Sequence, residues 1–229
     1  HPFEPGFLWD AGIGPLIPFS IRGAAWYQGE SNASTDWRVR QHDVLFPLLV
    51  SDWRKQWGLG DFQFLYVQLP RMERPWWPMF RESQRLLLGQ LSNVGMAITI
   101  DLGDPNDVHP REKREVGRRL ARLALGKGSG PLPLTLTVSG KQATVVFSDK
   151  LRTRDNGMVA GFEAAGSDGV YHPAHATIAG DRAVVTSSFV PRIRSVRYAW
   201  APVPTANVVG DTGLPASPFE LHHIVQLKG

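Results

Sequence analysis

The 229-residue sequence contains no cysteine. This absence excludes a disulfide-stapled scaffold, a thiolate zinc site and a cysteine nucleophile. A chain of this length can bury a sizeable core without such cross-links, as one large domain or two small ones. The protein therefore relies on packing for its stability and on other side chains for any chemistry.

Long hydrophobic runs are also missing, because Pro, Gly and Ser interrupt the uncharged stretches, and no segment is expected to span a bilayer. Apolar residues make up 42% of the chain and charged residues 20%, which is typical of a globular protein and argues against disorder. The net charge of +4 is small for a nucleic-acid-binding protein of this length. We therefore expect neither a membrane nor a nucleic acid as a partner.

The first 128 residues alternate between strand-like and helix-like runs. Apolar spacing predicts strands at 21–27, 62–69 and 95–101, and helices at 35–57, 79–91 and 111–125. This order is typical of parallel strands joined by right-handed crossovers. Within the first helix, Pro47 is expected to kink or split it, and Gly58 to end it.

The pattern changes after a Gly-rich linker at 127–131. Five short segments then show the two-residue period of half-buried strands, separated by Gly, Asn and Asp turns; they are 134–138, 143–147, 161–164, 183–186 and 196–200. The sequence therefore predicts an α/β domain at 1–128, with helices on both faces of a parallel sheet, and a small antiparallel β-sandwich-like domain at 129–229.

The α/β part is too small for the sheet it predicts. Parallel sheets are covered on both faces and usually contain about five strands, so three strands would leave an open apolar edge. The sequence also begins with His1 instead of Met and shows no signal-peptide pattern. We therefore expect a missing strand to come from elsewhere, and this sequence to be a processed chain or part of a longer protein.

Two polar clusters follow predicted strands: residues 28–32 and residues 101–110. In parallel sheets ligands bind at the carboxyl ends of the strands, so both clusters should lie on one rim. His109 has the chemistry of a general base, and Asp107 or Asp104 could orient it. The alternative is that His109 only caps the following helix.

Ser31 occupies a strand end, where an exposed nucleophile could lie, but it could equally cap a helix or order the loop. The side-chain amides of Gln28 and Asn32 could stabilise an oxyanion, or could simply form loop hydrogen bonds. The pair Trp76 and Trp77, flanked by prolines, could stack on a sugar ring or plug the structure. Polar contacts there could come from Arg81 and Glu82, for which surface roles are the alternative.

Three stretches of the sequence resemble a known family. They are PLIPFSIRGAAWYQGESNA at 15–33, ITIDLGDPNDVHPREKREVGRRL at 98–120, and the pieces YAW at 198–200 and GLPASPF at 213–219. Together they resemble the sialate O-acetylesterase-like carbohydrate esterases of the SGNH/GDSL hydrolase superfamily. The resemblance implies a flavodoxin-like α/β hydrolase domain followed by a β-sandwich-like domain.

The resemblance also implies an activity, the removal of acetyl groups from sugar hydroxyls through an acyl-serine intermediate, without a metal or other cofactor. His109 would be the base and Asp107 its partner, although the superfamily pattern Asp-x-x-His has Asn106 in place of its Asp. The loop Gln28, Gly29, Glu30, Ser31 and Asn32 would shape the oxyanion and substrate side. A secreted or periplasmic location is a further implication.

The family's nucleophile belongs to a Gly-Gln-Ser-Asn motif that this sequence does not contain. We therefore expect the serine to come from an N-terminal segment or separate chain of the same protein, as a partner that completes the sheet. The expected substrates are acetylated xylan or xyloglucan, or acetylated sialic acid. The alternatives are a non-catalytic carbohydrate-binding fragment that uses Trp76 and Trp77, and a self-contained esterase built from Ser31, His109 and Asp107.

Overall fold

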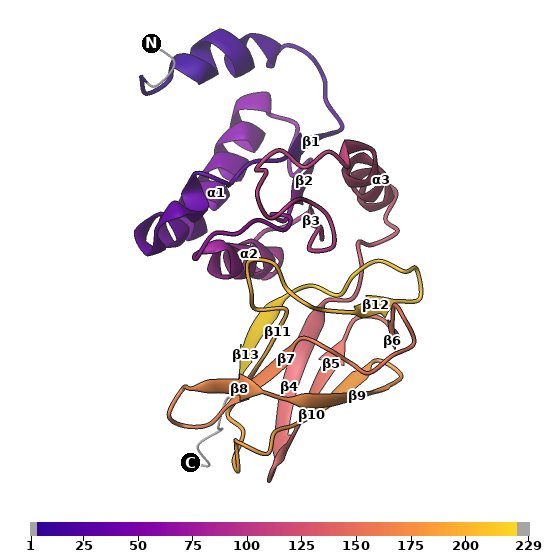
Figure 1. Ribbon diagram of the computed structural model, residues 1–229. Coiled ribbons are helices and arrows are strands. Elements are labelled where there is room, and N and C mark those ends of the chain that lie inside the picture. The colour runs from indigo at the N-terminus through magenta and orange to yellow at the C-terminus, as the bar shows by residue number, and fades with distance from the viewer. Residues whose placement is uncertain (1–3, 224–229) are drawn as a thin grey trace, which may run out of the picture.

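The computed structural model describes residues 4–223, which form an α/β half and a β half stacked end to end (Figure 1). The α/β half is built on a parallel sheet in the order β1 (Gly23–Trp26), β2 (Gln63–Val67) and β3 (Val94–Ala97). Its helices are α1 (Asp36–Trp57), α2 (Trp77–Leu86) and α3 (Lys113–Ala124). Shorter helical turns are η1 (Trp9–Ile13), η2 (Gly14–Leu16), η3 (Asn32–Ser34) and η4 (Leu87–Gly89).

The helices cover the two faces of the sheet unequally. Phe64 and Tyr66 of β2 pack with Phe46 of α1 in the main core, whereas Val67 packs with Val116 of α3 on the other face. Successive strand residues point to opposite faces, so this division follows the period of two along β2. On the α3 side, β1 carries only Gly23 and Ala25, which are exposed. One edge and one face of β1 therefore lack a covering element within residues 4–223.

The β half contains two four-stranded antiparallel sheets with the orders β4-β5-β10-β9 and β13-β11-β7-β8, and a two-stranded pair β12-β6. The strands are β4 (Pro133–Ser139), β5 (Gln142–Phe147), β6 (Leu151–Thr153), β7 (Phe162–Ala165), β8 (Tyr171–Pro173), β9 (His175–Ala179), β10 (Arg182–Thr186), β11 (Ser195–Tyr198), β12 (Val208–Gly210) and β13 (Phe219–His222). Alternate residues of both sheets enter one apolar core, which continues into the α/β half.

The predicted fold class is confirmed, since a parallel sheet with helices precedes antiparallel sheets. The expected split of the first helix at Pro47 is wrong, because α1 runs unbroken from Asp36 to Trp57. One missing backbone hydrogen bond in a helix of 22 residues is outweighed by the remaining bonds and by packing of the inner face. Gly58 ends α1 as expected, in the left-handed conformation.

Several elements escaped the sequence analysis. The segment before β1 forms η1, whose Trp9 ring lies 6.4 Å from that of Trp53. Strands β6, β8 and β12 are each three residues long. Such short strands show no detectable alternation of apolar and polar residues. Within residues 4–223 no helix combines the length and the hydrophobicity needed to cross a membrane.

Candidate functional site

Three loops meet at the carboxyl ends of the parallel strands. They follow β1, β2 and β3 respectively, and a cavity of about 390 Å³ lies between them. The residues that line it are Glu30, Ser31, Ala33, Ser34, Arg74, Pro75, Trp77 and Val108. The two polar clusters of the sequence thus lie at one rim, as parallel strands require, and the loop after β2 forms the wall between them.

The loop after β1 is held rigidly by glycine and by a side-chain pair. Gly29 has φ = +148°, and a Cβ atom there would lie 2.4 Å from a ring carbon of Phe80. The Gln28 side-chain amide donates to the Asn32 side-chain oxygen over 2.6 Å. The two candidate oxyanion residues therefore orient one another, and Gln28 keeps a second amide hydrogen for a ligand.

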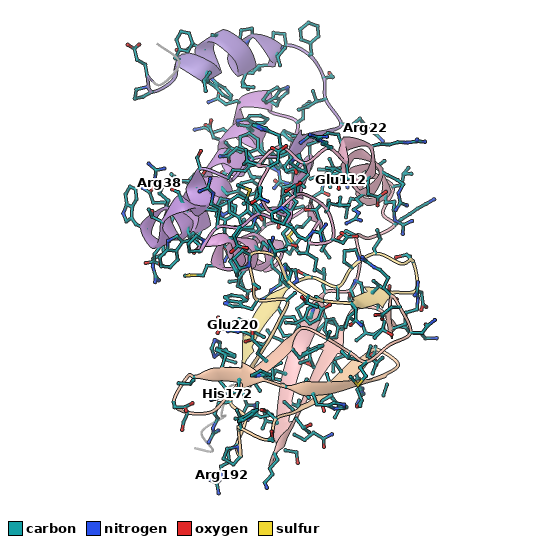
Figure 2. The ribbon with its side chains drawn as sticks, in the orientation of Figure 1. Arg22, Arg38, Glu112, His172, Arg192 and Glu220 are labelled. Atoms are coloured by element: carbon teal, nitrogen blue, oxygen red, sulfur yellow. The ribbon has the colours of Figure 1, made fainter. Side chains whose placement is uncertain are left out.

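Ser31 is exposed at the cavity, and its backbone carbonyl helps to hold the loop. Its backbone carbonyl accepts hydrogen bonds from the Ser34 hydroxyl at 2.9 Å and from the Arg38 guanidinium at 3.2 Å. Across the described chain, no hydrogen bond joins the Ser31 hydroxyl to a base. In Figure 2, Arg38 on α1 and Glu112 just before α3 lie on opposite sides of the α/β half.

His109 and Asp107 come together at the end of the third loop. The His109 Nδ1 atom lies 3.8 Å from Asp107 Oδ1, and the two side chains are 87% and 43% exposed. The same Asp107 oxygen accepts the His109 backbone N–H at 2.8 Å, and an Asp104 oxygen accepts that of Asn106. Asp107 is thus the carboxylate beside the imidazole, and a small rotation would convert the contact into a hydrogen bond.

The residues proposed for sugar contact are mostly buried. Trp77 is 2% exposed and donates its indole N–H to the Pro70 carbonyl, so it supports the cavity wall. Trp76 is only partly exposed and packs against the same apolar cluster. The expectation that Arg81 contacts a sugar is wrong, because this side chain is fully buried and its donors already bind backbone carbonyls. The sequence shows residue type along a helix, whereas the direction of each side chain depends on what the helix packs against.

A second polar set lies between α1 and α2, away from the rim. The Ser83 hydroxyl donates to Asp43, and His42 Nδ1 lies 2.8 Å from the same hydroxyl oxygen, so Nδ1 carries the hydrogen in that bond. Burial lowers the pKa of His42 to about 4, against a smaller opposing effect of Asp43. Because Ser83 is 5% exposed and gives its own hydrogen to Asp43, this set joins two helices and is not a catalytic site.

Two further residues at the rim were missed by the sequence analysis. Arg74 lines the cavity, but no motif around it indicated a role. Tyr27 directly precedes the first loop, and burial, reinforced by Glu30 and Glu112, raises the pKa of its hydroxyl above the ordinary value. Tyr27 therefore remains a neutral phenol. Among residues 4–223 no group of three or more His, Cys, Asp or Glu side chains is placed to hold a metal ion.

The parallel sheet followed by antiparallel sheets is the fold of a carbohydrate acetylesterase. A carbohydrate acetylesterase from Xanthomonas citri superposes with a TM-score of 0.87 at 38% sequence identity, over 93% of this chain. Residues 13–126 match the family model described as "Carbohydrate esterase, sialic acid-specific acetylesterase". The chain belongs to this family of sialate O-acetylesterase-like carbohydrate esterases.

Curated relatives carry the same family name. Sialate O-acetylesterase from Mus musculus is 34% identical over 58% of this chain, and that from Rattus norvegicus is 27% identical over 95% of it. The matched regions cover 29% and 47% of those proteins, and 53% of the Xanthomonas citri chain. This chain therefore spans about half or less of the length of the relatives it matches.

Proposed function

We propose that this chain supplies the base-bearing part of a carbohydrate O-acetylesterase. The supporting observation is the His109–Asp107 pair on either side of Val108, which lines the rim cavity of a chain in the acetylesterase family. An imidazole can take a proton from a serine hydroxyl as the oxygen attacks an acetyl carbonyl. His109 then returns the proton to the departing sugar oxygen, and in the second half-reaction it activates the water that releases acetate.

The nucleophilic serine, on this proposal, comes from an N-terminal segment or chain that docks beside β1. Within the described chain, β1 pairs only with β2, and its exposed face adjoins an open cavity of about 840 Å³. The cavity is lined by residues 20–25 and by Leu59, Phe62, Gln63, Leu65, Asn93 and Ala124. A parallel strand beside β1 would end at the same rim as the other strands, so the residue after it would lie on the same side of the sheet as the loop that carries His109.

The loop at 28–32 would then form the oxyanion and substrate side of the completed site. Gln28 retains an amide hydrogen for the developing oxyanion, and its bond to Asn32 fixes its direction in advance. Arg74 and Glu30 bring opposite charges to the cavity wall, and this balance favours a neutral glycan. The proposed substrates are acetylated xylan or xyloglucan, with acetylated sialic acid as the competing candidate in the assay.

The test is acetate release by the longer protein that contains this chain, using acetylated xylan, acetylated xyloglucan and O-acetylated sialic acid. His109→Asn should lower turnover by about three to four orders of magnitude, because the base is lost. Asp107→Asn should also lower turnover strongly, whereas Asp104→Asn, a matched change in the same loop, should cost far less. Near-normal turnover in His109→Asn would exclude the proposal.

A second experiment locates the nucleophile. A fluorophosphonate probe should label the longer protein on a serine outside these 229 residues, and Ser31→Ala should leave that labelling intact. Label on Ser31 would instead support a self-contained triad of Ser31, His109 and Asp107. Sugar binding without label on any segment would support the non-catalytic carbohydrate-binding alternative.

A further inference from the structure

Arg81 is a fully buried cation in α2, the helix that lies next to the β half in Figure 1. In the described part of the chain it has no carboxylate partner within ion-pair distance. Burial lowers the pKa of its guanidinium to about 9, which shows how unfavourable this location is for a charge. An apolar side chain at this position of α2 would avoid the free-energy cost of burying a charge. The hydrogen bonds of the guanidinium are therefore the reason to look for a role of Arg81.

All four recorded hydrogen bonds of the guanidinium go to backbone carbonyls on two distant segments. Toward the α/β half, Nε donates to Leu69 O at 2.8 Å and Nη2 donates to Pro70 O at 2.6 Å. Toward the β half, Nη1 donates to Ala201 O and Nη2 to Pro202 O, both at 2.9 Å. The rigid planar fork therefore joins the loop after β2 to the loop after β11.

The loop after β2 in turn supports the loop that carries the proposed dyad. The Arg71 N–H donates to Leu102 O and the Glu73 N–H donates to Pro105 O, each over 2.9 Å. Contact is close enough that a Cβ atom on Gly103, whose φ is +90°, would lie 2.9 Å from the Arg71 carbonyl oxygen. Residues 71–73 thus lie directly against residues 102–105, and Asp107 follows two positions after this contact in the chain.

A second link between the halves is weaker. Arg154 of the β half donates to Asp101 at 3.2 Å, but its side chain is 49% exposed and Asp101 already pairs with the buried Arg119. An exposed link of this kind is screened by solvent. Glu82 of α2 also accepts a hydrogen bond from the backbone of Glu220 in β13. Of these links, Arg81 is the one that is fully buried and reaches the loop after β2.

We propose that Arg81 is a positioning residue, through which the β half fixes the loop after β2 and, by way of residues 102–105, the placement of Asp107 and His109. The catalytic part of this inference rests on the proposed esterase function. It assigns the β half a role in the site although the cavity is lined by residues of the α/β half alone.

The first test is hydrogen exchange on the 229-residue chain, with Arg81→Lys compared against Arg54→Lys. Arg54 is a matched control, because it is 9% exposed and donates to the carbonyls of Phe62, Ser92 and Asn93 at the opposite ends of the strands. In Arg81→Lys, the amides of Arg71 and Glu73 should exchange at least tenfold faster. In Arg54→Lys, acceleration should be confined to 61–64 and 92–94. Unchanged exchange at Arg71 and Glu73 in Arg81→Lys, or the same pattern in both variants, would overturn the proposal.

Pro202→Gly provides a variant that leaves Arg81 in place and removes no core side chain. It keeps the accepting carbonyl but loosens its backbone, so the Arg71 and Glu73 amides should again exchange faster than in the parent chain. No change there would contradict the coupling, even if Arg81→Lys proved too unstable to study.

The second test uses the longer, active protein. Displacement of a catalytic pair by about 1 Å can cost a hundredfold in rate, so Arg81→Lys should lower kcat by about that factor while Arg54→Lys does not. In Arg81→Ala, added methylguanidinium should restore part of the turnover and methylammonium should not. If His109→Asn abolishes turnover but Arg81→Lys does not, only the positioning role fails; if His109→Asn is active, the proposed function fails.

Discussion

At the scale of single residues, the site depends on close packing of its loops against neighbouring side chains. Gly29 lies in a backbone conformation that favours glycine, directly against the ring of Phe80. The spacing of His109 and Asp107 was visible in the sequence, because two residues in one short loop cannot lie far apart. The burial of Arg81 was not visible, because two of its four carbonyl partners, Ala201 and Pro202, lie about 120 positions further along the chain.

Replacing Gly29 with Ala should destabilise the chain and displace the loop that carries Gln28. The added methyl group combines backbone strain with a clash on Phe80, and we expect a loss of about 2–4 kcal/mol in the free energy of unfolding. Gly128→Ala is the matched control, because φ is +68° there but no atom lies within 4 Å of the added carbon. That variant should lose about 1 kcal/mol. Urea denaturation of both variants measures the difference, and equal losses would contradict the role of Phe80.

At the scale of elements, the periodicity of the sequence predicted helices and strands. It did not predict the contacts through which they pack against one another. Thr35 caps α1 by accepting the Arg38 N–H, and Gly58 ends the same helix, both local signals. The contact between α1 and α2 instead uses His42 and Ser83, which are 41 positions apart. Nothing in the local pattern marks such a pair, and the sequence analysis missed it.

The buried His42 between α1 and α2 should make the free energy of unfolding depend on pH. The pKa of His42 is about 4 in the folded chain and about 6.5 when unfolded, so the unfolded state binds the proton first as the pH falls. Stability is therefore complete above pH 6.5 and declines toward pH 4, by about 3 kcal/mol from this residue.

Denaturation of the 229-residue chain at pH 7 and at pH 4.5 tests this expectation. His42→Gln should show a smaller loss between the two conditions than the parent chain, whereas the exposed His109→Gln should behave like the parent. An unchanged pH dependence in His42→Gln would show that His42 is not responsible.

At the scale of the whole molecule, the parallel sheet lacks a covering element at β1 in the part of the chain that the structure describes. Three parallel strands are fewer than such sheets usually contain, and this shortage was already apparent in the sequence. The structure adds which face of β1 is open, namely the face of Gly23 and Ala25 beside the larger cavity. It also shows that the core continues from one half into the other.

Ala25→Lys should separate the behaviour of this chain from that of the longer protein. Ala25 is exposed in residues 4–223, so the lysine should leave the unfolding midpoint of this chain nearly unchanged. In the longer protein the proposed docking segment would bury it, and we expect a loss of about 1–3 kcal/mol together with reduced acetate release. Thr137→Lys, at an exposed position of β4, is the control. Equal stability and activity of the two variants in the longer protein would contradict docking at β1.

The sequence by itself determined the class of fold and the two polar clusters, because apolar period and strand-end chemistry are properties of neighbouring residues. It also indicated the family, through long motifs around Gln28 and His109. Only the tertiary structure decided that Asp107, rather than Asp104, lies beside the imidazole, that Trp77 supports the cavity wall and that Arg81 links the halves. The Arg81 link depends on which surfaces pack together, because it joins segments about 120 positions apart. The places of Asp107 and Trp77 depend on the conformation that their own loops adopt in the folded chain.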